Sequence, residues 1–414
     1  FLCIFENKPG CVGAARLDSP LAVGIGNDEY FFASDVLAFS QHTDQVIFLA
    51  NRQIVIAQHG RLELFGFDGQ KIDGNATQVA WEIGDISKRD HTHFTLKEIH
   101  EQSETIRRAG RGKLDQFREK VMSSTKLFIT ACGTSYHAGL IAKHLLARLE
   151  RISSEVVLAS EFRQVRDLIT PDATILAISQ SGETADLLDA VREAKKRGAK
   201  ILSIVNAPGS SLVRESDLGI FVDCGPEIGV AATKSFTGQL AVLYRLLAGD
   251  VPDLGQIFDA EDEIARIAEK YKDSPDFYFI GRSLHYVVAL EGALKLKELS
   301  YIHAEGMPAG ELKHGTLALI SPGVPVVAIN PFDETYSDTL SNAEEMKARG
   351  AKIIGVSNKN SPVYDEYIPI PDVEELFYPI VEVVPLQLLA YYMSLKKGAN
   401  PDFPRNLAKS VTVK

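Results

Sequence analysis

The feature that most constrains the fold is an alternation of apolar, strand-like runs with helical segments, which occurs twice along the chain. In the first half, the apolar runs 126–131, 173–178 and 201–205 indicate buried strands, and a helical pattern follows each of the first two. Strands that are joined by helices pair in parallel, so this order predicts a parallel sheet covered by helices on both faces. The predicted fold class is therefore α/β.

The second half of the chain repeats this pattern. The segment 195–201 matches the segment 346–353, with Lys195 aligned to Lys347, so the two halves lie 152 residues apart. The run 277–283 also opens the second half as 127–135 opens the first. Two tandem α/β units, each with a flavodoxin-like parallel sheet, are the natural interpretation.

The remaining segments differ in composition from these units. Short apolar stretches between polar turns indicate five short strands before residue 72, too few to bury a core easily, so we expect part of a domain there. The predicted organisation is a β-rich remnant at 1–72, a linker with a docking helix at 73–115, α/β domains at 116–255 and 256–398, and a C-terminal tail at 399–414.

The overall charge restricts the partners of the chain. Its 414 residues include 44 Lys and Arg against 55 Asp and Glu, a formal net charge of −11. Because nucleic-acid binding needs a basic face, this balance argues against a nucleic-acid partner. A small anion remains compatible, since a few hydroxyls and backbone N–H groups suffice to hold one phosphate.

Other whole-chain features point to a cytoplasmic protein. No apolar run reaches the ~18 to 20 residues needed to span a membrane, so we expect no membrane partner. The four cysteines form no CxxC pair and no metal spacing with His, which favours a reduced compartment and no metal site. The first residues include neither an initiator Met nor a basic leader, so the chain is expected to begin inside a longer protein.

Two hydroxyl-rich turns follow neighbouring strands of the first α/β unit. In an open parallel sheet, ligands bind beyond the carboxyl ends of the strands, where these turns lead into helix N-termini. Plain N-capping explains one such turn equally well, whereas two on neighbouring strands favour a phosphate site. The turns contain Cys132, Gly133, Thr134 and Ser135, and Ser179, Gln180, Ser181, Gly182, Glu183 and Thr184. The second half has Asp333 at the matching place, so we predict one phosphate site, in the first unit.

A helical segment and a loop in the second unit carry the other candidate groups. Lys295 and Glu298 are three residues apart, which makes them neighbours on one helix face. They form either a surface ion pair of little consequence or an acid/base carboxylate tuned by a cation. In residues 302–315, glycines and a proline predict a loop with two His and two Glu, either a polar turn or part of a site, at no metal spacing.

These segments together resemble the glucosamine-6-phosphate synthases, which are isomerising glutamine:fructose-6-phosphate aminotransferases. The synthase half of that family contains two sugar isomerase (SIS) domains. The resemblance runs from about residue 73 to the end, and residues 1–72 resemble the last part of the family's glutaminase domain. It is carried by residues 132–135, 179–184, 227–231, 291–298, 310–315 and 405–413. The family's N-terminal cysteine nucleophile is absent, and neither Cys3 nor Cys11 is placed to replace it.

The resemblance implies a role for each matching residue, with no cofactor and no metal. Lys409 would form a Schiff base with C2 of fructose-6-phosphate, and Glu298, beside Lys295, would move the proton between C1 and C2. His314, donated by the partner in a homodimer, would open the sugar ring. Phosphate contacts would come from Ser135, Ser179, Gln180, Ser181 and Thr184, and sugar contacts from Thr134, Val230 and Ala408. Ala232 stands where the family usually has Ser, which removes one hydrogen bond to the sugar.

Two other functions remain as alternatives. A phosphosugar-sensing SIS module would bind without turnover, but it would need the serines and not Lys409, Glu298 and His314 together. A sugar-phosphate deaminase or deglycase would run related chemistry in reverse, and the tail 406–413 argues against it. The predicted product of the synthase is glucosamine-6-phosphate.

Overall fold

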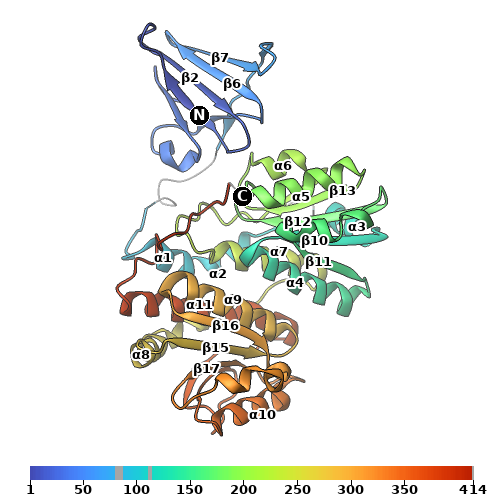
Figure 1. Ribbon diagram of the computed structural model, residues 1–414, viewed down its shortest axis with the longest axis vertical. Helices are drawn as coiled ribbons and strands as arrows, with labels where there is room; N and C mark the ends of the chain where they lie inside the picture. Colours follow the sequence, from blue (N-terminus) through green and yellow to red (C-terminus); the bar gives the residue numbers. More distant parts are fainter. Residues whose placement is uncertain (80–86, 111–113, 413–414) are drawn as a thin grey trace.

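The computed structural model describes residues 1–79, 87–110 and 114–412. Parts of the predicted linker (80–86 and 111–113) and of the predicted tail (413–414) therefore lie outside the described residues. Figure 1 shows three parts along the long axis: an N-terminal β unit in blue, a first α/β domain in green, and a second α/β domain in yellow to orange. The tail, in dark red, runs back from the second domain to the first.

The N-terminal β unit consists of two antiparallel sheets. Its inward side chains, such as Val23, Leu49 and Val55, form one small core, and Phe39 with Val46 belongs to another. One sheet has the order β1 (Leu2–Ile4), β2 (Cys11–Arg16), β6 (Gln53–Gln58), β7 (Arg61–Gly66), β8 (Lys71–Ile72), and the other β4 (Tyr30–Ala33), β3 (Ala22–Ile25), β5 (Gln45–Phe48), β9 (Thr77–Gln78). Because β9 pairs with β5, the antiparallel pairing extends beyond residue 72.

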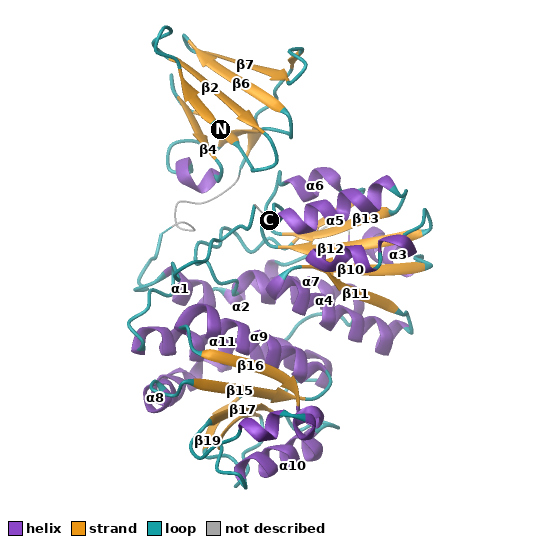
Figure 2. Ribbon diagram, viewed as in Figure 1, coloured by secondary structure: helices purple, strands orange, loops and turns teal. Residues whose placement is uncertain are grey.

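The first α/β domain contains a five-stranded parallel sheet. Its central strands β10, β12 and β13 are mostly apolar and buried because helices cover both faces, as Figure 2 shows for α4 and α7 on one side and α5 and α6 on the other. The strand order is β11 (Ser154–Leu158), β10 (Lys126–Ala131), β12 (Ala173–Ser179), β13 (Lys200–Val205), β14 (Leu218–Phe221). The helices are α4 (Gly133–Leu145), α5 (Ala185–Lys196), α6 (Ser211–Glu215) and α7 (Lys234–Leu247). The three strands expected from the sequence are confirmed.

The second α/β domain repeats the same strand order, which confirms the predicted repeat. Its sheet is β16 (His303–Pro308), β15 (Asp276–Gly281), β17 (Pro325–Ile329), β18 (Lys352–Ser357), β19 (Glu366–Pro369). Its helices are α8 (Glu261–Tyr271), α9 (Leu284–Ser300), α10 (Tyr336–Lys347) and α11 (Tyr378–Lys396). The prediction that 302–315 is all loop was wrong: β16 pairs in parallel with β15 and buries Ala304 and Met307. Gly306 fits this strand because it packs against the backbone of α9.

One hydrophobic core joins the two α/β domains. It is shared by α4 and α7 of the first domain and by α9 and α11 of the second. The segment Glu375–Lys396 is long and apolar enough to cross a membrane by length and composition, contrary to the sequence expectation. However, 94% of its apolar window is buried inside the protein, so this segment is the central helix of the shared core.

The predicted docking helix forms and packs on the same core. It is α1 (Phe94–His100), which contacts α11 and is followed by α2 (Gln102–Arg108), packed against α7. A third helix, α3 (Leu114–Met122), also packs against α7. The contacts of these helices thus fix the first half of the chain to the second, and all three helices precede both α/β sheets in the sequence.

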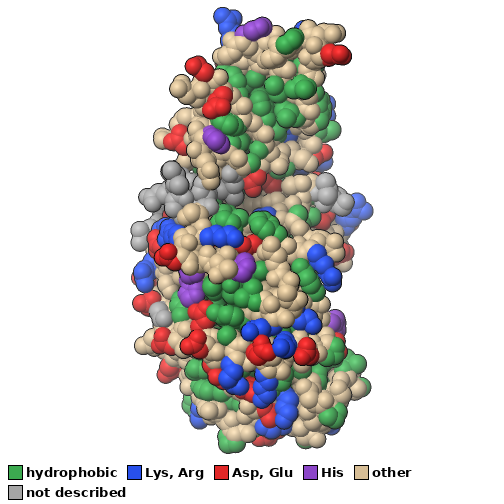
Figure 3. Space-filling model, turned by 90° about the vertical axis from the view of Figure 1, so that its left-hand side faces the viewer, with side chains coloured by type: hydrophobic (Ala, Val, Ile, Leu, Met, Phe, Trp, Pro, Cys, Tyr) green, Lys and Arg blue, Asp and Glu red, His purple; other side chains and the backbone are tan. Residues whose placement is uncertain are grey.

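The surface of the molecule carries charges of both signs. Over the face shown in Figure 3, Lys and Arg side chains are intermingled with Asp and Glu.

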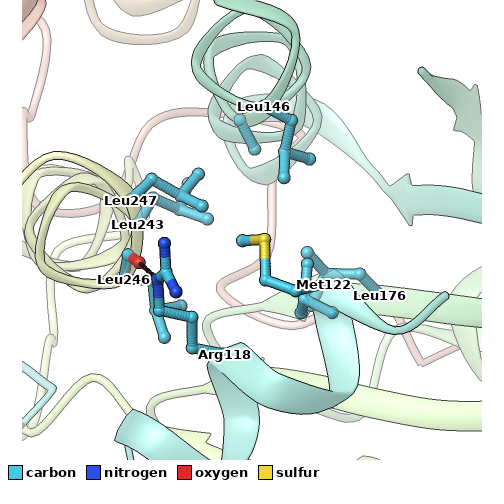
Figure 4. A pocket seen from close by; sticks show the side chains of 9 residues that line it. Arg118, Met122, Leu146, Leu176, Leu243, Leu246 and Leu247 are labelled. Atoms are coloured by element: carbon cyan, nitrogen blue, oxygen red, sulfur yellow. Dashed lines mark hydrogen bonds between the residues drawn. The ribbon is translucent and has the colours of Figure 1, made fainter. Parts of the chain in front are cut away.

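A small cavity lies inside the first domain between α3, α4 and α7. Its volume is about 10 Å³, and its lining is apolar apart from Arg118, as Figure 4 shows. The Arg118 Nε donates to the carbonyl of Leu246 at 3.0 Å and so has a partner already. A space of this size holds at most about one water and offers no polar group for a ligand, so it is a packing gap.

A buried charge cluster occupies the carboxyl edge of the second sheet. His285, near the start of α9, has its Nε2 2.7 Å from Asp333 Oδ2 and its Nδ1 2.7 Å from Glu382 Oε1. Burial alone would lower the pKa of His285, but the two carboxylates outweigh it and raise the pKa to about 10. The charge of Asp333 is thus compensated by His285. Asp333 lies at the position where the first domain has a serine-rich turn.

We predict that His285→Ala destabilises the protein by about 3–5 kcal/mol, because it leaves Glu382 buried beside another carboxylate. A raised His pKa contributes stability that is complete below the unfolded value near 6.5 and is lost as the pH rises through about 10. The difference between variant and wild type should therefore be large at pH 7 and shrink toward pH 10 in urea unfolding followed by circular dichroism. His303→Ala is the control, since its ion pair with Asp276 is exposed. Equal unfolding of both variants would contradict the account.

Candidate active site

The two hydroxyl-rich turns lie side by side at the carboxyl edge of the first sheet. The strands that precede them, β10 and β12, are paired in parallel, with Thr130 opposite Ala177. In the second turn, the Gly182 N–H donates to Ser179 Oγ at 2.9 Å and the Glu183 N–H donates to Ser181 Oγ at 3.2 Å. These bonds hold the hydroxyls around a helix N-terminus, an arrangement that suits a phosphate.

Glycine is required at position 182 of the second turn. Its φ is +65°, and a Cβ there would lie 2.7 Å from Ser210 Cβ and 2.9 Å from Val205. Thr184 follows at the N-cap of α5. In the first turn, Ser135 Oγ accepts a hydrogen bond from Gln239 of α7 at 3.0 Å. Both turns are therefore fixed by neighbouring elements rather than by their own sequence alone.

A chain of contacts connects the first turn to helix α9 of the second domain. Thr134 Oγ1 donates to Glu291 Oε1 at 3.0 Å, and His137 Nδ1 lies 2.6 Å from Glu291 Oε2. Glu291 lies 3.5 Å from Lys295 Nζ, which in turn lies 2.5 Å from Glu298 Oε2. The predicted proximity of Lys295 and Glu298 is confirmed, and the pair is not a surface pair.

The electrostatics of this group keep Lys295 charged. Its side chain is 1% exposed, so burial would lower its pKa, but Glu298 and Glu291, with a smaller effect from Glu227, raise the pKa above its usual value. The side chain of Glu298 is 24% exposed, more than that of Lys295 or Glu291, and it is not among the residues that line a large cavity beside Lys409. An ionised carboxylate beside a fixed cation suits proton abstraction from carbon.

The described part of the C-terminal tail docks along the first domain through specific hydrogen bonds, although many of its side chains stay exposed. Asp402 begins this docking: its Oδ1 accepts the Thr95 N–H of α1 at 2.8 Å, and its carbonyl accepts the Val230 N–H at 3.0 Å. Farther along, the carbonyl of Val411 accepts the Ala185 N–H of α5 at 3.0 Å. The tail therefore crosses the carboxyl edge of the first sheet beside the second hydroxyl turn.

Between these anchors, Lys409 points into the protein. Its Nζ donates to Glu227 Oε2 at 2.6 Å and to the carbonyl of Gly229 at 2.7 Å. Glu227 is fully buried and also accepts N–H groups of Thr233 and Ser235 at 2.9 and 3.0 Å. Burial would raise the pKa of Glu227, but Lys409 and these donors lower it to about 2.

A second buried carboxylate, Glu98, lies beside this ion pair. Its Oε1 accepts the N–H groups of Ile228 at 2.5 Å and Gly229 at 3.3 Å. Burial and the nearby charge of Glu227 raise the pKa of Glu98 to about 7. The two carboxylates therefore differ in protonation although they lie on either side of one loop.

The second turn and the tail share a large cavity with the N-terminal β unit. Its volume is about 1080 Å³, and Gln180, Ser181, Glu227 and Lys409 line it together with Arg16 of β2. Arg16 also bonds across the boundary, with its Nη2 3.0 Å from Glu183 and 2.6 Å from Ser211 Oγ. This cavity is large enough for a sugar phosphate, and the N-terminal β unit forms part of its wall.

The remaining predicted site residues make fewer contacts with the groups described above. His314 is exposed at the end of the 3-10 helix η7 (Ala309–His314), and in the described part of the chain no hydrogen bond or ion pair joins it to Lys409 or Glu298. Ala408 is exposed next to Lys409, and Val230 and Ala232 are half-buried in the loop that follows Glu227. Cys132 and Gly133 form the start of the first turn, where burial raises the pKa of Cys132 to about 11.

The sequence interpretation missed Glu291, His137, Glu227 and Glu98 as site residues. A signal existed for Glu291, because it precedes Lys295 by four residues and so shares its helix face. The positions of the other three depend on contacts between segments that are far apart in sequence.

Comparison with known proteins decides the family. The SIS domain family matches residues 120–248 and 270–397. Over 99% of its length, the chain is 45% identical to the isomerising glutamine–fructose-6-phosphate aminotransferase of Thermococcus kodakarensis and covers 73% of that protein. It is 44% identical to the enzyme of the same name from Methanothermobacter thermautotrophicus, again over 99% of its length and covering 72% of that protein. The chain belongs to this aminotransferase family.

Solved structures agree with this assignment. The C-terminal domain of glucosamine-fructose-6-phosphate aminotransferase from Francisella tularensis superposes with a TM-score of 0.71 and 36% identity, covering 77% of this chain and all of that one. A glucosamine-6-phosphate deaminase from Thermotoga maritima, 24% identical, has a TM-score of 0.60 over 77% of this chain and 99% of its own, which shows the shared fold alone. The expected membership of the aminotransferase family is confirmed.

We predict that Gly182→Ala weakens the binding of fructose-6-phosphate by about tenfold or more, equivalent to about 1.4 kcal/mol. The added Cβ would press on Ser210 and Val205 at a positive φ and so displace the amides of the second turn. Isothermal titration calorimetry measures the affinity. Gly60→Ala is the matched control, because Gly60 has a φ of +69° with nothing within 4 Å of the added Cβ. Unchanged affinity of a folded Gly182→Ala protein would refute the prediction.

Proposed function

We propose that this aminotransferase converts fructose-6-phosphate and ammonia to glucosamine-6-phosphate in a site shared by both α/β domains and the tail. The observation that carries the proposal is the inward position of Lys409, held at 2.6 Å from Glu227 next to the second hydroxyl turn. A solvated tail lysine would have no reason to be ordered against a buried carboxylate.

The phosphate of the substrate is held by the two turns of the first domain. The hydroxyls and amides there converge at helix N-termini, and no lysine is needed because the helix dipoles favour an anion. The residues proposed to contact it are Ser135, Ser179, Gln180, Ser181 and Thr184. Thr134, Val230 and Ala408 would contact the sugar, and Cys132 and Gly133 would shape the first turn.

Lys409 then reacts with the open-chain sugar. The Lys409 ammonium first gives up a proton to water, its amine then adds to the C2 carbonyl, and loss of water leaves an imine between Nζ and C2. Ammonia adds to the same carbon and expels the Lys409 amine, so the C2 imine now carries the nitrogen of ammonia. Glu227 and the Gly229 carbonyl orient the amine for the first step, since they accept its hydrogen bonds.

Glu298 completes the reaction by moving a proton. It removes a proton from C1 while the imine nitrogen takes up a proton, which gives an enamine with a double bond between C1 and C2, and it then returns its proton to C2. The C1 hydroxyl releases a proton as C1 becomes the aldehyde carbon, which balances the proton taken up by the nitrogen, and the product is the 2-amino aldose. Lys295, fixed by Glu291 and Glu298, places a positive charge 2.5 Å from the Glu298 carboxylate.

His314 is proposed to open the sugar ring from the partner subunit of a homodimer. Its exposed place at the end of η7, without a contact to Lys409 in the described residues, fits a side chain that serves a neighbouring site. In a symmetric dimer each subunit would then give one histidine and receive one.

Mixing two inactive variants tests this exchange. We predict that His314→Ala and Lys409→Ala are each inactive, and that mixing them under conditions of subunit exchange restores about a quarter of wild-type activity. Half of the mixed population is heterodimer, and one of its two sites has both wild-type groups. Product formation with ammonium as nitrogen donor is the readout. Failure to recover activity, although mass spectrometry detects heterodimers, would contradict donation across the interface.

Lys409→Ala alone tests the chemistry. We expect turnover to fall by about a thousandfold or more, because Lys234, which also lines the cavity, is bonded to Glu101 and does not replace the Lys409 amine, while fructose-6-phosphate still binds to the turns. Product formation and calorimetric affinity are measured on the same sample. Lys352→Ala serves as the control, since its side chain is 49% exposed and pairs with Asp365 in the second domain, away from the tail. Full activity of Lys409→Ala would refute the mechanism.

A further inference from the structure

Glu98 is a buried acid for which the proposed reaction has no use so far. It is 1% exposed, lies in α1, and belongs to the segment between the N-terminal β unit and the first sheet. Its carboxylate accepts two backbone N–H groups in a row, those of Ile228 and Gly229. When two consecutive backbone N–H groups donate to one carboxylate, they fix the orientation of their loop, as a side-chain cap fixes the N-terminus of a helix.

The loop fixed in this way is the one that holds Lys409. Glu227, which precedes the two amides, accepts the Lys409 Nζ, and the carbonyl of Gly229 accepts it from the other side of the loop. Val230, the next residue, is tied to the tail through its N–H group and the Asp402 carbonyl. Glu98 therefore binds the loop between Glu227 and the Gly229 carbonyl, which are the two groups that contact the Lys409 amine.

The loop packs closely against α1 at Gly229. A Cβ at Gly229 would lie 2.9 Å from Glu98 Oε2 and 2.9 Å from Thr95 Oγ1, so the loop lies directly on α1. Thr95 is itself bonded to the carbonyl of Pro401 and to Asp402, at the start of the tail. The same face of α1 thus sets the position of both the loop and the tail.

Burying the ionised Glu98 carboxylate costs free energy, which argues that this side chain does more than fill space. Burial and the neighbouring Glu227 raise the pKa of Glu98 to about 7, while Lys409 and Lys234 act in the opposite direction. Nearby, Lys97 of α1 pairs at 3.3 Å with Glu101, the residue between α1 and α2, and Lys234 bonds to Glu101 at 2.7 Å. A neutral side chain could satisfy the amides without the cost of burying a charge.

We propose that Glu98 is a positioning residue for Lys409, which orients the 228–229 amides so that the Gly229 carbonyl and Glu227 hold the amine at the reacting carbon. The inference rests on the proposed function, in which Lys409 forms the imine. Glu98 touches neither the substrate nor Lys409 and acts only through the loop.

The test compares kcat and KM of the full chain for fructose-6-phosphate, with ammonium as nitrogen donor, in wild type, Glu98→Ala and Glu98→Gln. We expect Glu98→Ala to lower kcat by about tenfold or more and to change KM by less than about threefold, since the phosphate turns are untouched. Glu98→Gln keeps one acceptor oxygen for the amides and should recover most of kcat at pH 8.

The pH profile gives a readout that a purely structural role would not change. The anionic form of Glu98, which accepts both amides, is populated above about pH 7, so kcat of the wild type should rise through that region. Glu98→Gln should lack this rise. Glu382→Gln is the control, because it removes a buried carboxylate of the second domain and should leave the rise in place.

The outcomes separate the two proposals. Wild-type kcat in Glu98→Ala, or a pH profile of Glu98→Gln identical to that of the wild type, would overturn the positioning role. If Glu98→Ala fails to fold, the profile of Glu98→Gln decides alone. Full activity of Lys409→Ala in the same assay would instead overturn the proposed function, whatever Glu98 does.

Discussion

The position of the tail depends on the ion pair between Lys409 and Glu227. Glu227 is fully buried, so its ionised form persists only because Lys409 and the donors of Thr233 and Ser235 surround it. The pair also links the end of the chain to the loop that follows the last strand of the first sheet. Removing either charge would leave the other one buried without a partner, at a cost of several kcal/mol. The tail is therefore a structural part of the first domain as well as a carrier of its amine.

The two α/β domains share one fold but present different groups at the same edge of their sheets. In the first, the turns after β10 and β12 offer hydroxyls at the N-termini of α4 and α5. In the second, His285 and its two carboxylates neutralise one another at the matching edge, and the useful groups lie on α9 instead. The Thr134–Glu291 hydrogen bond and the shared core of α4, α7, α9 and α11 hold the two sets together. In the proposed reaction, the anion-binding groups and the base therefore come from different copies of the repeat.

The sequence predicted those features that depend on local patterns. Strand and helix alternation, the tandem repeat, the two turns and the Lys295–Glu298 contact all follow from spacing along the chain. The strand His303–Pro308 was missed because its glycine and proline suggest a loop, whereas tertiary packing on α9 favours the strand. Glu98, Glu227 and His137 were missed because their partners lie more than a hundred residues away in sequence or across a domain boundary. Membership of the aminotransferase family, by contrast, was predicted from short motifs and is confirmed by the comparisons.

The most direct test of the account is to find the amine that bonds to the substrate. Fructose-6-phosphate is added to the protein in the presence of borohydride, which reduces an imine to a stable secondary amine, and the modified peptide is identified by mass spectrometry. The account predicts a single phosphosugar adduct on Lys409, and no adduct in Lys409→Ala. An adduct on another lysine, or turnover without any trapped adduct, would contradict the central role of this residue.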